Sequence, residues 1–247
     1  MFNGKDEAGN DLDANFQVIF TVIQAAPVVE VGPDRMADEG SAVTLIQTTF
    51  TDGNSADTHT ATFDWGDGSP IVTAVVGELD RQVLVGEPFP YISWKGTVSG
   101  PPHLYVDDGD YTVTVTVADD GGAKGTGTMV FTVNNVSPVV DAGDDQAVNK
   151  GAAVVLAPAS FTDVGALDTH TAIIDWGDGS PVEVGVVAEV NGSGTVAGSH
   201  VYTDDGLFEV TVTVFDFDGG EGGDSLTTTD RPTCNGLAAT HVGTDAS

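Results

Sequence analysis

Aspartates gather in loops at matching places in the two halves of the chain, and they are the side chains best suited to chemistry. Those of the first half are Asp52, Asp57, Asp119 and Asp120. Those of the second half, together with an asparagine just before it, are Asp163, Asp168, Asp216, Asp218 and Asn135. Carboxylate and carbonyl oxygens are the ligands of calcium, which takes about six to eight of them. We therefore predict calcium as the cofactor at these loops. The alternative is that the carboxylates are merely hydrated, because a strongly acidic surface also suits salt-rich surroundings.

Two further aspartates, Asp67 and Asp178, stand in identical Asp-Trp-Gly-Asp-Gly-Ser-Pro segments. A carboxylate in such a place could be read as a metal ligand or a catalytic acid. Gly-Asp-Gly also supplies the positive φ angles and the side-chain-to-backbone hydrogen bonds that a tight turn requires. We therefore assign both aspartates to turns.

The histidines do not form a zinc motif. His59 and His170 begin equivalent apolar strands, and neither has a cysteine or a further histidine nearby in the sequence. Zinc sites in proteins are built mainly from these two residue types. A structural or surface role is therefore predicted for both histidines, and equally for His103 and His200.

Three aromatic residues, Phe89, Tyr91 and Trp94, lie in a proline-containing stretch that only the first half carries. Aromatic faces stack on sugar rings or anchor a protein partner. These residues are the candidate ligand-binding site, with a protein or a polysaccharide as the partner. The alternative is an extended hairpin that packs against its own domain.

The sequence offers no specific sign of catalysis. Paired carboxylates of the kind that glycosidases use are bound to occur by chance in so acidic a chain. No nucleophile elbow, phosphate-binding loop or zinc-protease motif is present. We therefore expect that the chain is not an enzyme.

An internal repeat organises these candidate residues. Residues 27–70 align without a gap on residues 138–181, at a constant offset of 111, and 24 of the 44 positions are identical. The match resumes at His-Leu-Tyr (103–105) and His-Val-Tyr (200–202), where the offset is 97. The first copy is therefore longer by 14 residues, which is the difference between the two offsets. Such a duplication predicts two tandem domains.

Apolar residues alternate with polar ones within each copy. Residues 111–117 read Tyr-Thr-Val-Thr-Val-Thr-Val, and residues 208–214 repeat the pattern with Phe in place of Tyr and Glu in place of the first Thr. Alternation of this kind predicts half-buried antiparallel strands. The strands before the two Gly-Asp-Gly turns alternate likewise, which places Trp65 and Trp176 inside. Several short strands separated by turns are typical of an all-β sandwich.

Composition excludes some functions. The 38 acidic residues against 7 basic ones give 247 residues a net charge of −31, so nucleic acid is a poor partner. No apolar run is long enough to insert into a membrane. Because Cys234 is the only cysteine, no intrachain disulfide can form.

Each half carries Asp-Trp-Gly-Asp-Gly-Ser, then His-x-Tyr, then a Val-Thr-Val strand followed by an Asp-containing turn. This order of motifs resembles that of PKD (polycystic kidney disease) domains. The resemblance implies an all-β fold of two tandem immunoglobulin-like sandwiches, over residues 27–136 and 137–229. It also implies that loop aspartates and a linker residue bind calcium at the domain junction. Tyr105 and Tyr202 resemble the corner tyrosine of immunoglobulin-like folds, with a buried ring and a hydroxyl bonded to backbone.

The second copy departs from the motif near its end. Residues 226–230, Leu-Thr-Thr-Thr-Asp, stand where the first copy has alternating Met129, Phe131 and Val133. With one apolar residue in this segment, the last strand of domain 2 is expected to be weak or frayed.

The flanks indicate a piece of a longer protein. Residues 1–26 resemble the terminal strands of a truncated bacterial Ig-like module or a linker. Residues 230–247 are read as a tail, in which 233–245 resemble the lead-in to RTX-type calcium repeats. Both point to a secreted or cell-surface location in a bacterial multidomain protein.

The expected function is that of a non-catalytic extracellular spacer or adhesion segment, stiffened by calcium and monomeric within a longer chain. Its linker is short, since only residues 134–137 separate the last strand of domain 1 from Pro138. The alternative function is a carbohydrate- or matrix-binding accessory module of a secreted hydrolase, which would use the aromatic stretch.

Overall fold

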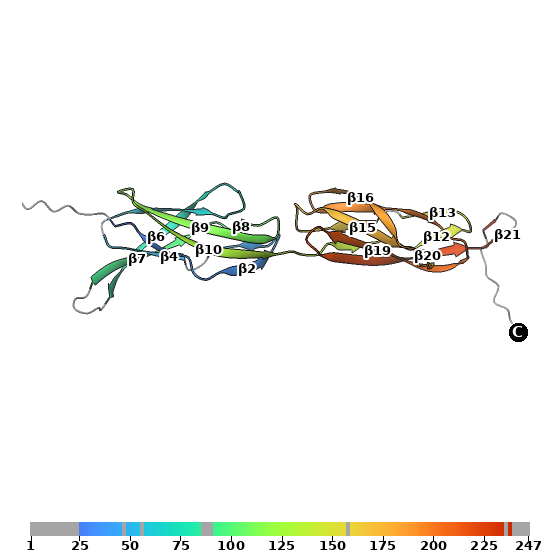
Figure 1. The fold of residues 1–247 in the computed structure, drawn as a ribbon, viewed down its shortest axis with the longest axis horizontal. Coiled ribbons are helices and arrows are strands. Elements are labelled where there is room, and N and C mark those ends of the chain that lie inside the picture. The colour runs from blue at the N-terminus through green and yellow to red at the C-terminus, as the bar shows by residue number, and fades with distance from the viewer. Residues whose placement is uncertain are drawn as a thin grey trace, which may run out of the picture.

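The computed structural model of the chain describes residues 25–45, 48–54, 57–84, 91–156, 159–234 and 237–238. All the regular secondary structure among these residues is β-strand, and the strands form two similar sandwiches that lie end to end (Figure 1). The prediction of an all-β fold with two tandem immunoglobulin-like sandwiches is therefore confirmed. No helix in this described part is long and apolar enough to cross a lipid bilayer.

The described residues of domain 1 form ten strands. Their bounds are β1 Val28–Glu30, β2 Arg35–Asp38, β3 Ala42–Val43, β4 Thr48–Asp52, β5 His59–Asp64, β6 Val72–Leu84, β7 Tyr91–Ser99, β8 His103–Leu104, β9 Gly109–Asp119 and β10 Lys124–Asn134. Eight of them pair in the order β1-β4-β7-β6-β5-β9-β10-β2, and β3 pairs with β8. The β10–β2 pair is parallel, whereas β9 pairs antiparallel with both β5 and β10.

Domain 2 repeats this arrangement. Its strands are β11 Val139–Asp141, β12 Gln146–Asn149, β13 Ala153–Val155, β14 Ala159–Thr162, β15 His170–Asp175, β16 Glu183–Val190, β17 Ser193–Ala197, β18 Ser199–Val201, β19 Gly206–Asp216 and β20 Glu221–Arg231. The order β11-β14-β17-β16-β15-β19-β20-β12 matches that of domain 1 strand by strand. Two short strands, β21 Thr233–Cys234 and β22 Leu237–Ala238, pair after it.

One strand in each domain joins the two layers of the sandwich. Residues 72–74 of β6 pair with β5, and from Val75 onward β6 pairs with β7. In domain 2, β16 pairs first with β15 and then with β17. The change of partner turns one continuous set of paired strands over on itself and encloses a core between the layers.

The cores consist of the residues that alternation predicted. Val113, Val115 and Val117 of β9 are completely buried, as are their counterparts Val210, Val212 and Val214 of β19. Trp65 and Trp176 lie in the same cores. Full burial of a side chain of this size contributes about 1.5–3 kcal/mol. The long strand β9 therefore stabilises the core of domain 1, and β19 stabilises that of domain 2.

Both predicted corner tyrosines are found. The Tyr105 hydroxyl donates a hydrogen bond to the Trp65 carbonyl at 3.0 Å, and the Tyr202 hydroxyl donates to the Trp176 carbonyl at 2.9 Å. Both rings are buried. Each tyrosine therefore fixes the end of the tryptophan strand against the strand that follows the corner.

The Gly-Asp-Gly segments form turns, as predicted. One Asp67 oxygen accepts the Ser69 amide at 3.0 Å, and the flanking Gly66 and Gly68 have φ angles of 82° and 81°. The other Asp67 oxygen lies 2.8 Å from Nε2 of His103. Domain 2 has the same contacts around its own turn aspartate. These aspartates and histidines are therefore occupied in holding the turns.

The expectation of a weak last strand in domain 2 is wrong. β20 has 11 residues, like β10, and pairs with β19 from Glu221 to Asp230 without interruption. Thr228 and Asp230 are buried at the places that Phe131 and Val133 occupy in domain 1. Backbone hydrogen bonds to β19 and to the parallel β12 hold the strand in place of apolar side chains.

The flanking segments contribute little to the described structure. The predicted Ig-like remnant over residues 1–26 lies almost wholly outside the described residues. Most of the predicted RTX lead-in lies outside them as well.

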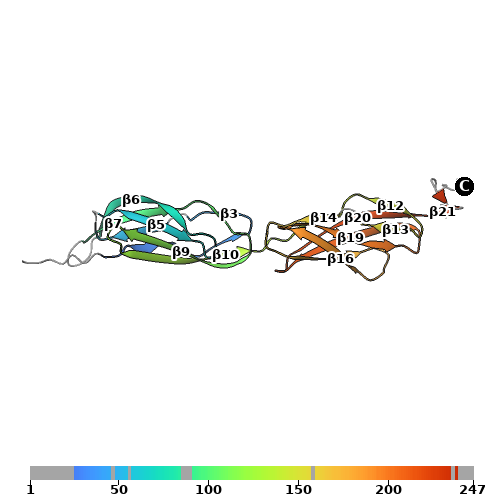
Figure 2. The ribbon, with the colours of Figure 1, turned by 90° about the horizontal axis from the view of Figure 1, so that it is seen from above.

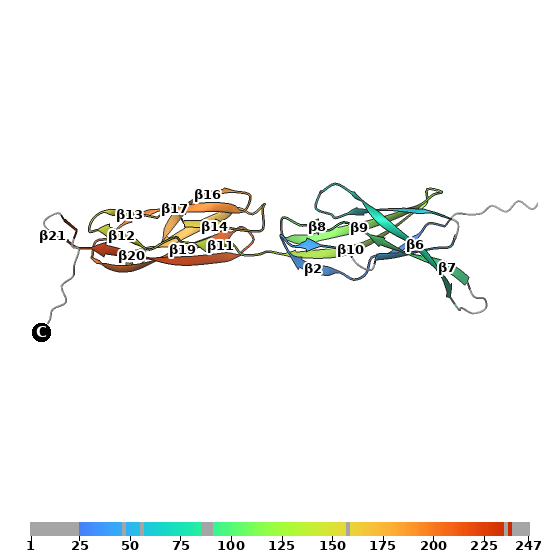
Figure 3. The ribbon, with the colours of Figure 1, turned by 180° about the vertical axis from the view of Figure 1, so that it is seen from behind.

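The two domains lie in line and meet through loops. At the domain 1 side these are the β2–β3 turn and the loop between β8 and β9. At the domain 2 side they are the β14–β15 loop and the β19–β20 turn. Residues 135–138 connect the domains, and the views from above and from behind show the same end-to-end arrangement (Figures 2 and 3).

Candidate metal centre at the domain junction

Carboxylates from both domains converge at this junction. Three groups of three bring one oxygen of each member within 4.8 Å of the others. The groups are Glu39, Asp107 and Asp168; Asp163, Asp168 and Asp216; and Asp107, Asp108 and Asp218. We call these seven residues the junction cluster.

Domain 2 supplies a triad from two loops. Asp163 follows β14 and accepts the Gly165 amide at 2.9 Å, which holds the loop in a tight turn. Asp216 ends β19, accepts the Gly220 amide at 2.6 Å, and accepts the Asn135 side-chain amide at 3.0 Å. Two of the three carboxylates are thus oriented by the backbone and by the linker.

Asp168 is the third member of this triad and differs from the other two. Its side chain lies just before β15, and the residue is 8% exposed. Neither carboxylate oxygen has a hydrogen-bond partner. An ionised carboxylate that is buried without a partner is costly, and a bound cation would offset that cost.

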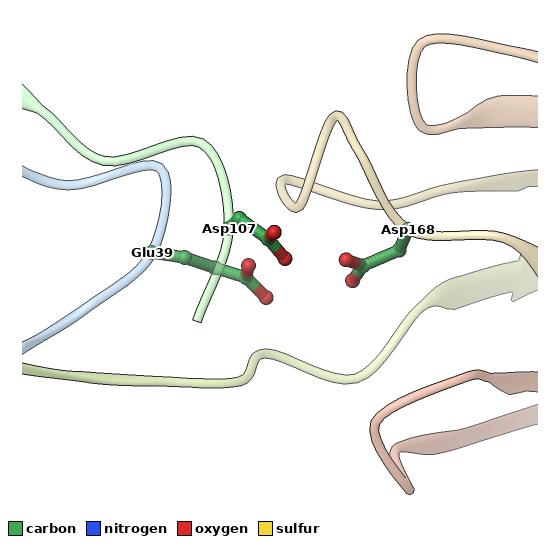
Figure 4. A group of neighbouring side chains, drawn as sticks. All are labelled: Glu39, Asp107 and Asp168. Carbon is green, nitrogen blue, oxygen red and sulfur yellow. The ribbon is translucent and has the colours of Figure 1, made fainter. Parts of the chain in front are cut away.

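Domain 1 presents Glu39 to Asp168 from across the junction. Glu39 lies in the β2–β3 turn and is 1% exposed. One of its oxygens accepts the Val136 amide at 2.8 Å, and the other has no partner. Figure 4 shows the Glu39 and Asp107 side chains pointing toward Asp168. The two domains therefore aim three carboxylates at one point.

The backbone around this point is shaped for close approach. Gly40 has a φ of 67°, and a Cβ atom there would collide with Val164 of domain 2. A Cβ atom on Gly165 would collide with unpartnered oxygens of both Asp168 and Glu39. Glycine at these two positions leaves room both for domain contact and for an ion between the carboxylates.

Electrostatic repulsion dominates the cluster. Burial, together with the charges of Glu39 and Asp163, raises the pKa of Asp168 to about 7. Burial also raises the pKa of Glu39, and so does the charge of Asp163 across the junction. The pKa of Asp108 is raised by burial and by the charge of Asp218. Each shift has the direction that a nearby cation would reverse.

Positive charge to balance the cluster is lacking in the described part of the chain. No lysine or arginine there forms a salt bridge with any of its seven carboxylates. The one titratable partner is His170, whose Nε2 lies 3.2 Å from Asp163 and whose Nδ1 lies 2.6 Å from Glu189. Burial lowers the pKa of His170, but these two carboxylates outweigh it and raise the pKa overall.

A second cluster lies at the opposite end of domain 1 and copies the domain 2 triad. Asp52, Asp57 and Asp119 form a group within the same 4.8 Å limit. One Asp52 oxygen accepts the Asn54 amide at 2.8 Å, and the other lies 3.3 Å from Nε2 of His59. Asp119 is 6% exposed, and its second oxygen has no partner. We call this group the end cluster.

The structure thus brings together eight of the nine metal ligands suggested by the sequence. Asp163, Asp168 and Asp216 form one triad, Asp52, Asp57 and Asp119 form another, Asp218 joins a third, and Asn135 contacts Asp216. The exposed Asp120 belongs to none of the groups found among the described residues. It follows directly after the end of β9.

Sequence reasoning missed Glu39, Asp107 and Asp108. All three lie at the end of domain 1 that meets domain 2, and they approach the domain 2 aspartates only because the domains meet end to end. Asp107 and Asp108 stand in an Asp-Asp-Gly segment that both copies share and that reads as a turn. Glu39 aligns with Lys150, and this difference between the copies was the one available signal.

The candidate aromatic site is only partly within the described structure. Phe89 lies outside the described residues. Tyr91 and Trp94 belong to β7, where the backbone pairs with Leu84 and Arg81 of β6. The assignment of these aromatic residues to ligand binding stays a prediction.

Comparisons with known proteins agree with this architecture. Residues 135–231 match the family model of the PKD domain. None of the curated proteins matches the chain. The second sandwich is therefore similar to a PKD domain, and the first shares its strand order. Domains of this type are typically non-catalytic accessory modules of extracellular proteins.

Solved structures with similar folds include a single PKD domain and two tandem-domain proteins. The PKD domain of an M14-like peptidase from a Thermoplasmatales archaeon is 25% identical, with a TM-score of 0.33, and covers 40% of this chain and 100% of its own. The fibronectin(III)-like modules of Clostridium thermocellum CbhA are 13% identical, with a TM-score of 0.32 and coverage of 88% and 100%. The titin Ig tandem domains are 11% identical, with a TM-score of 0.34 and coverage of 86% and 100%.

Proposed function

We propose that the chain is a non-catalytic spacer of an extracellular or cell-surface protein, and that calcium at the junction holds its two domains as a stiff rod. The observation that carries this proposal is the meeting of Glu39 and Asp168 across the junction, both buried and both with unpartnered oxygens. We infer further that the chain acts as a monomer and holds neighbouring modules away from a cell surface or matrix.

The chemistry of the cluster favours calcium. The three groups offer only carboxylate oxygens, which suit hard cations rather than zinc or copper. Loop residues from two domains form an irregular site, and calcium tolerates irregular coordination better than magnesium. The amide oxygen of Asn135 is also buried without a partner and adds a neutral oxygen donor near Asp216.

A cation changes the balance of forces at the joint. Without one, carboxylates of the two domains repel each other across the junction, where the burial of Glu39 and Asp168 limits screening by water. With one, the same carboxylates are drawn to a common point, and the domains cannot separate without breaking metal–oxygen bonds. The short connection, with Pro138 directly after it, then leaves little freedom for bending.

Small-angle X-ray scattering of the purified chain with calcium and after chelation tests the proposal. We expect the largest dimension to be longer and better defined with calcium. Asp168→Asn is expected to behave as the chelated protein in both conditions, whereas Asp120→Asn, outside the clusters, is expected to behave as the wild type. An identical scattering curve with and without calcium would refute the stiffened rod.

The second candidate is a carbohydrate- or matrix-binding accessory module of a secreted hydrolase. The observation that favours it is the length of β6 and β7, which have 13 and 9 residues against 8 and 5 in β16 and β17. This hairpin extends from the body of domain 1 (Figure 3). Retention on insoluble polysaccharides that Trp94→Ala abolishes would support binding, and equal retention of both proteins would exclude this patch.

A further inference from the structure

Asp168 belongs to two of the three carboxylate groups at once. One group, Asp163, Asp168 and Asp216, lies wholly within domain 2, and the other joins Asp168 to Glu39 and Asp107 of domain 1. Both oxygens of the Asp168 carboxylate are buried and unpartnered, so each can serve one group. This is the arrangement of a carboxylate that bridges two metal ions.

In the observed geometry, a single ion does not reach both groups. Calcium–oxygen bonds are about 2.3–2.6 Å long, so two oxygens bound to one ion lie at most about 5 Å apart. Each triad satisfies this limit separately, but among the described residues the two triads do not merge into one larger group. Five carboxylates in contact also carry more negative charge than one divalent ion balances.

The two groups differ in what completes them. The domain 2 triad comes from loops of one domain, and the end cluster of domain 1 repeats it. The Glu39 group needs both domains, and Glu39 contributes an oxygen that is buried and unpartnered (Figure 4). The third group, Asp107, Asp108 and Asp218, is exposed or half-buried throughout, so water can hydrate its carboxylates.

We propose that the junction holds two divalent cations bridged by Asp168, an inner one bound by domain 2 alone and an outer one bound between the domains. The inference rests on the proposed cation joint and specifies its stoichiometry and order. The inner cation binds first, because its ligands are in place without domain 1. It neutralises the domain 2 loops, and the outer cation then fastens Glu39 and Asp107 to Asp168.

Calcium binding measured by equilibrium dialysis tests the number of ions. The protein used is Asp119→Asn, in which the end cluster is disabled while the asparagine oxygen can still accept the Ala123 amide. We expect two tightly bound calcium ions per chain. Adding Glu39→Gln is expected to leave one ion, and adding Asp168→Asn is expected to weaken both sites at least tenfold.

The number of calcium ions bound per chain distinguishes a failure of this inference from a failure of the proposed function. No bound calcium in Asp119→Asn would overturn both. One ion, with Glu39→Gln abolishing its binding, would overturn the two-ion inference and leave the cation joint intact. Three ions would overturn the inference as well, because the exposed third group would then be occupied.

Gly165→Ala provides a test that removes no ligand. The added methyl group would collide with one carboxylate oxygen each of Asp168 and Glu39, and the Gly165 backbone is not in the positive-φ region. Because the methyl group would displace the bridging Asp168 carboxylate as well as Glu39, we expect this variant to lose the outer ion and to scatter as a bent molecule in calcium. Gly53→Ala is the matched control in domain 1, where a Cβ atom meets nothing within 4 Å. Full binding by Gly165→Ala would contradict the placement of the outer ion.

Discussion

Asp168 is the carboxylate of the junction that is most strongly destabilised in its ionised form, since it is buried and faces Glu39 and Asp163 without a hydrogen-bond partner of its own. In the metal-free protein its pKa is raised to about 7, well above the value of about 3.9 in an unfolded chain. Between these two values the folded state binds more protons than the unfolded state. The free energy of unfolding therefore falls as pH rises through this range.

We expect metal-free protein to be more stable to denaturant at pH 5.5 than at pH 8. Asp168→Asn, which carries no charge at either pH, is expected to remove most of this difference and to be more stable than the wild type at pH 8 without metal. Urea unfolding of metal-stripped protein at the two pH values measures both effects. A wild type that is more stable at pH 8 would contradict the account of a buried, repelled carboxylate.

Asp178 shows the opposite behaviour. Hydrogen bonds from Ser180 and His200 lower its pKa to about 2. Its ionised form therefore stabilises the folded state above about pH 4, and this contribution is lost as pH falls through about 2. We expect Asp178→Asn to lower the free energy of unfolding at pH 7 by about 1–2 kcal/mol. A loss that persists undiminished at pH 2 in a still folded protein would show that the charge is not responsible.

At the scale of elements, strand β20 shows how a domain tolerates polar residues at core positions. Asp230 is 3% exposed, neither of its oxygens has a partner, and burial raises its pKa. The equivalent residue in domain 1 is Val133, which is also 3% exposed. Backbone pairing with β19 holds β20 despite the buried carboxylate.

Asp230→Val is therefore expected to stabilise domain 2 by about 1–3 kcal/mol, because it removes a buried polar group without a partner and leaves an apolar contact. Differential scanning calorimetry of the chain checks this through the transition of domain 2. Val133→Asp in domain 1 is the reverse change and should destabilise by a similar amount. A lower melting temperature in Asp230→Val would indicate a functional partner for this carboxylate.

The strands and the loop triads could be predicted from sequence because both depend on local signals. The alternation of apolar and polar residues identified β9 and β19, and the repeat identified the two domains. The loops that carry Asp163 and Asp168 adjoin predicted strands, so the end of the sandwich at which they lie could be predicted as well. Glu39 could not be found in this way. It becomes a candidate ligand only when two domains meet, and nothing local distinguishes it from any other acidic residue in a turn. β20 was misjudged for a related reason, since its stability comes from paired neighbours rather than from its own side chains.

At the scale of the whole molecule, the two ends of domain 2 differ. At the far end of domain 2, Lys150 takes the place of Glu39 and contacts Asp205 at 2.5 Å. Pro232 stands where the linker has Asn135. An ammonium group thus stands where the junction has the Glu39 carboxylate. A metal-bound joint of this kind is therefore expected on the N-terminal side of domain 2 and not on its C-terminal side.

Calcium is expected to bind the folded chain and not the unfolded chain, and so to raise the free energy of unfolding. A ligand at a hundredfold excess over its Kd adds about 2.7 kcal/mol to the free energy of unfolding. We expect a saturable rise of the melting temperature on calcium titration, and a smaller one with magnesium at equal concentration. In Asp168→Asn the rise should be confined to domain 1. Equal rises of the melting temperature with both metals would contradict a specific calcium site and would indicate that divalent ions merely screen the acidic surface.

The central claim is that bound cations fix the angle between the two domains, and a distance distribution between them tests it most directly. Spin labels at Thr112→Cys and Leu207→Cys, both exposed positions, with Cys234→Ser, place one probe on each domain. Double electron–electron resonance should give one narrow distance peak in calcium and a broad distribution after chelation, with Gly165→Ala broad in both conditions. A distribution of the same width with and without calcium would contradict the claim.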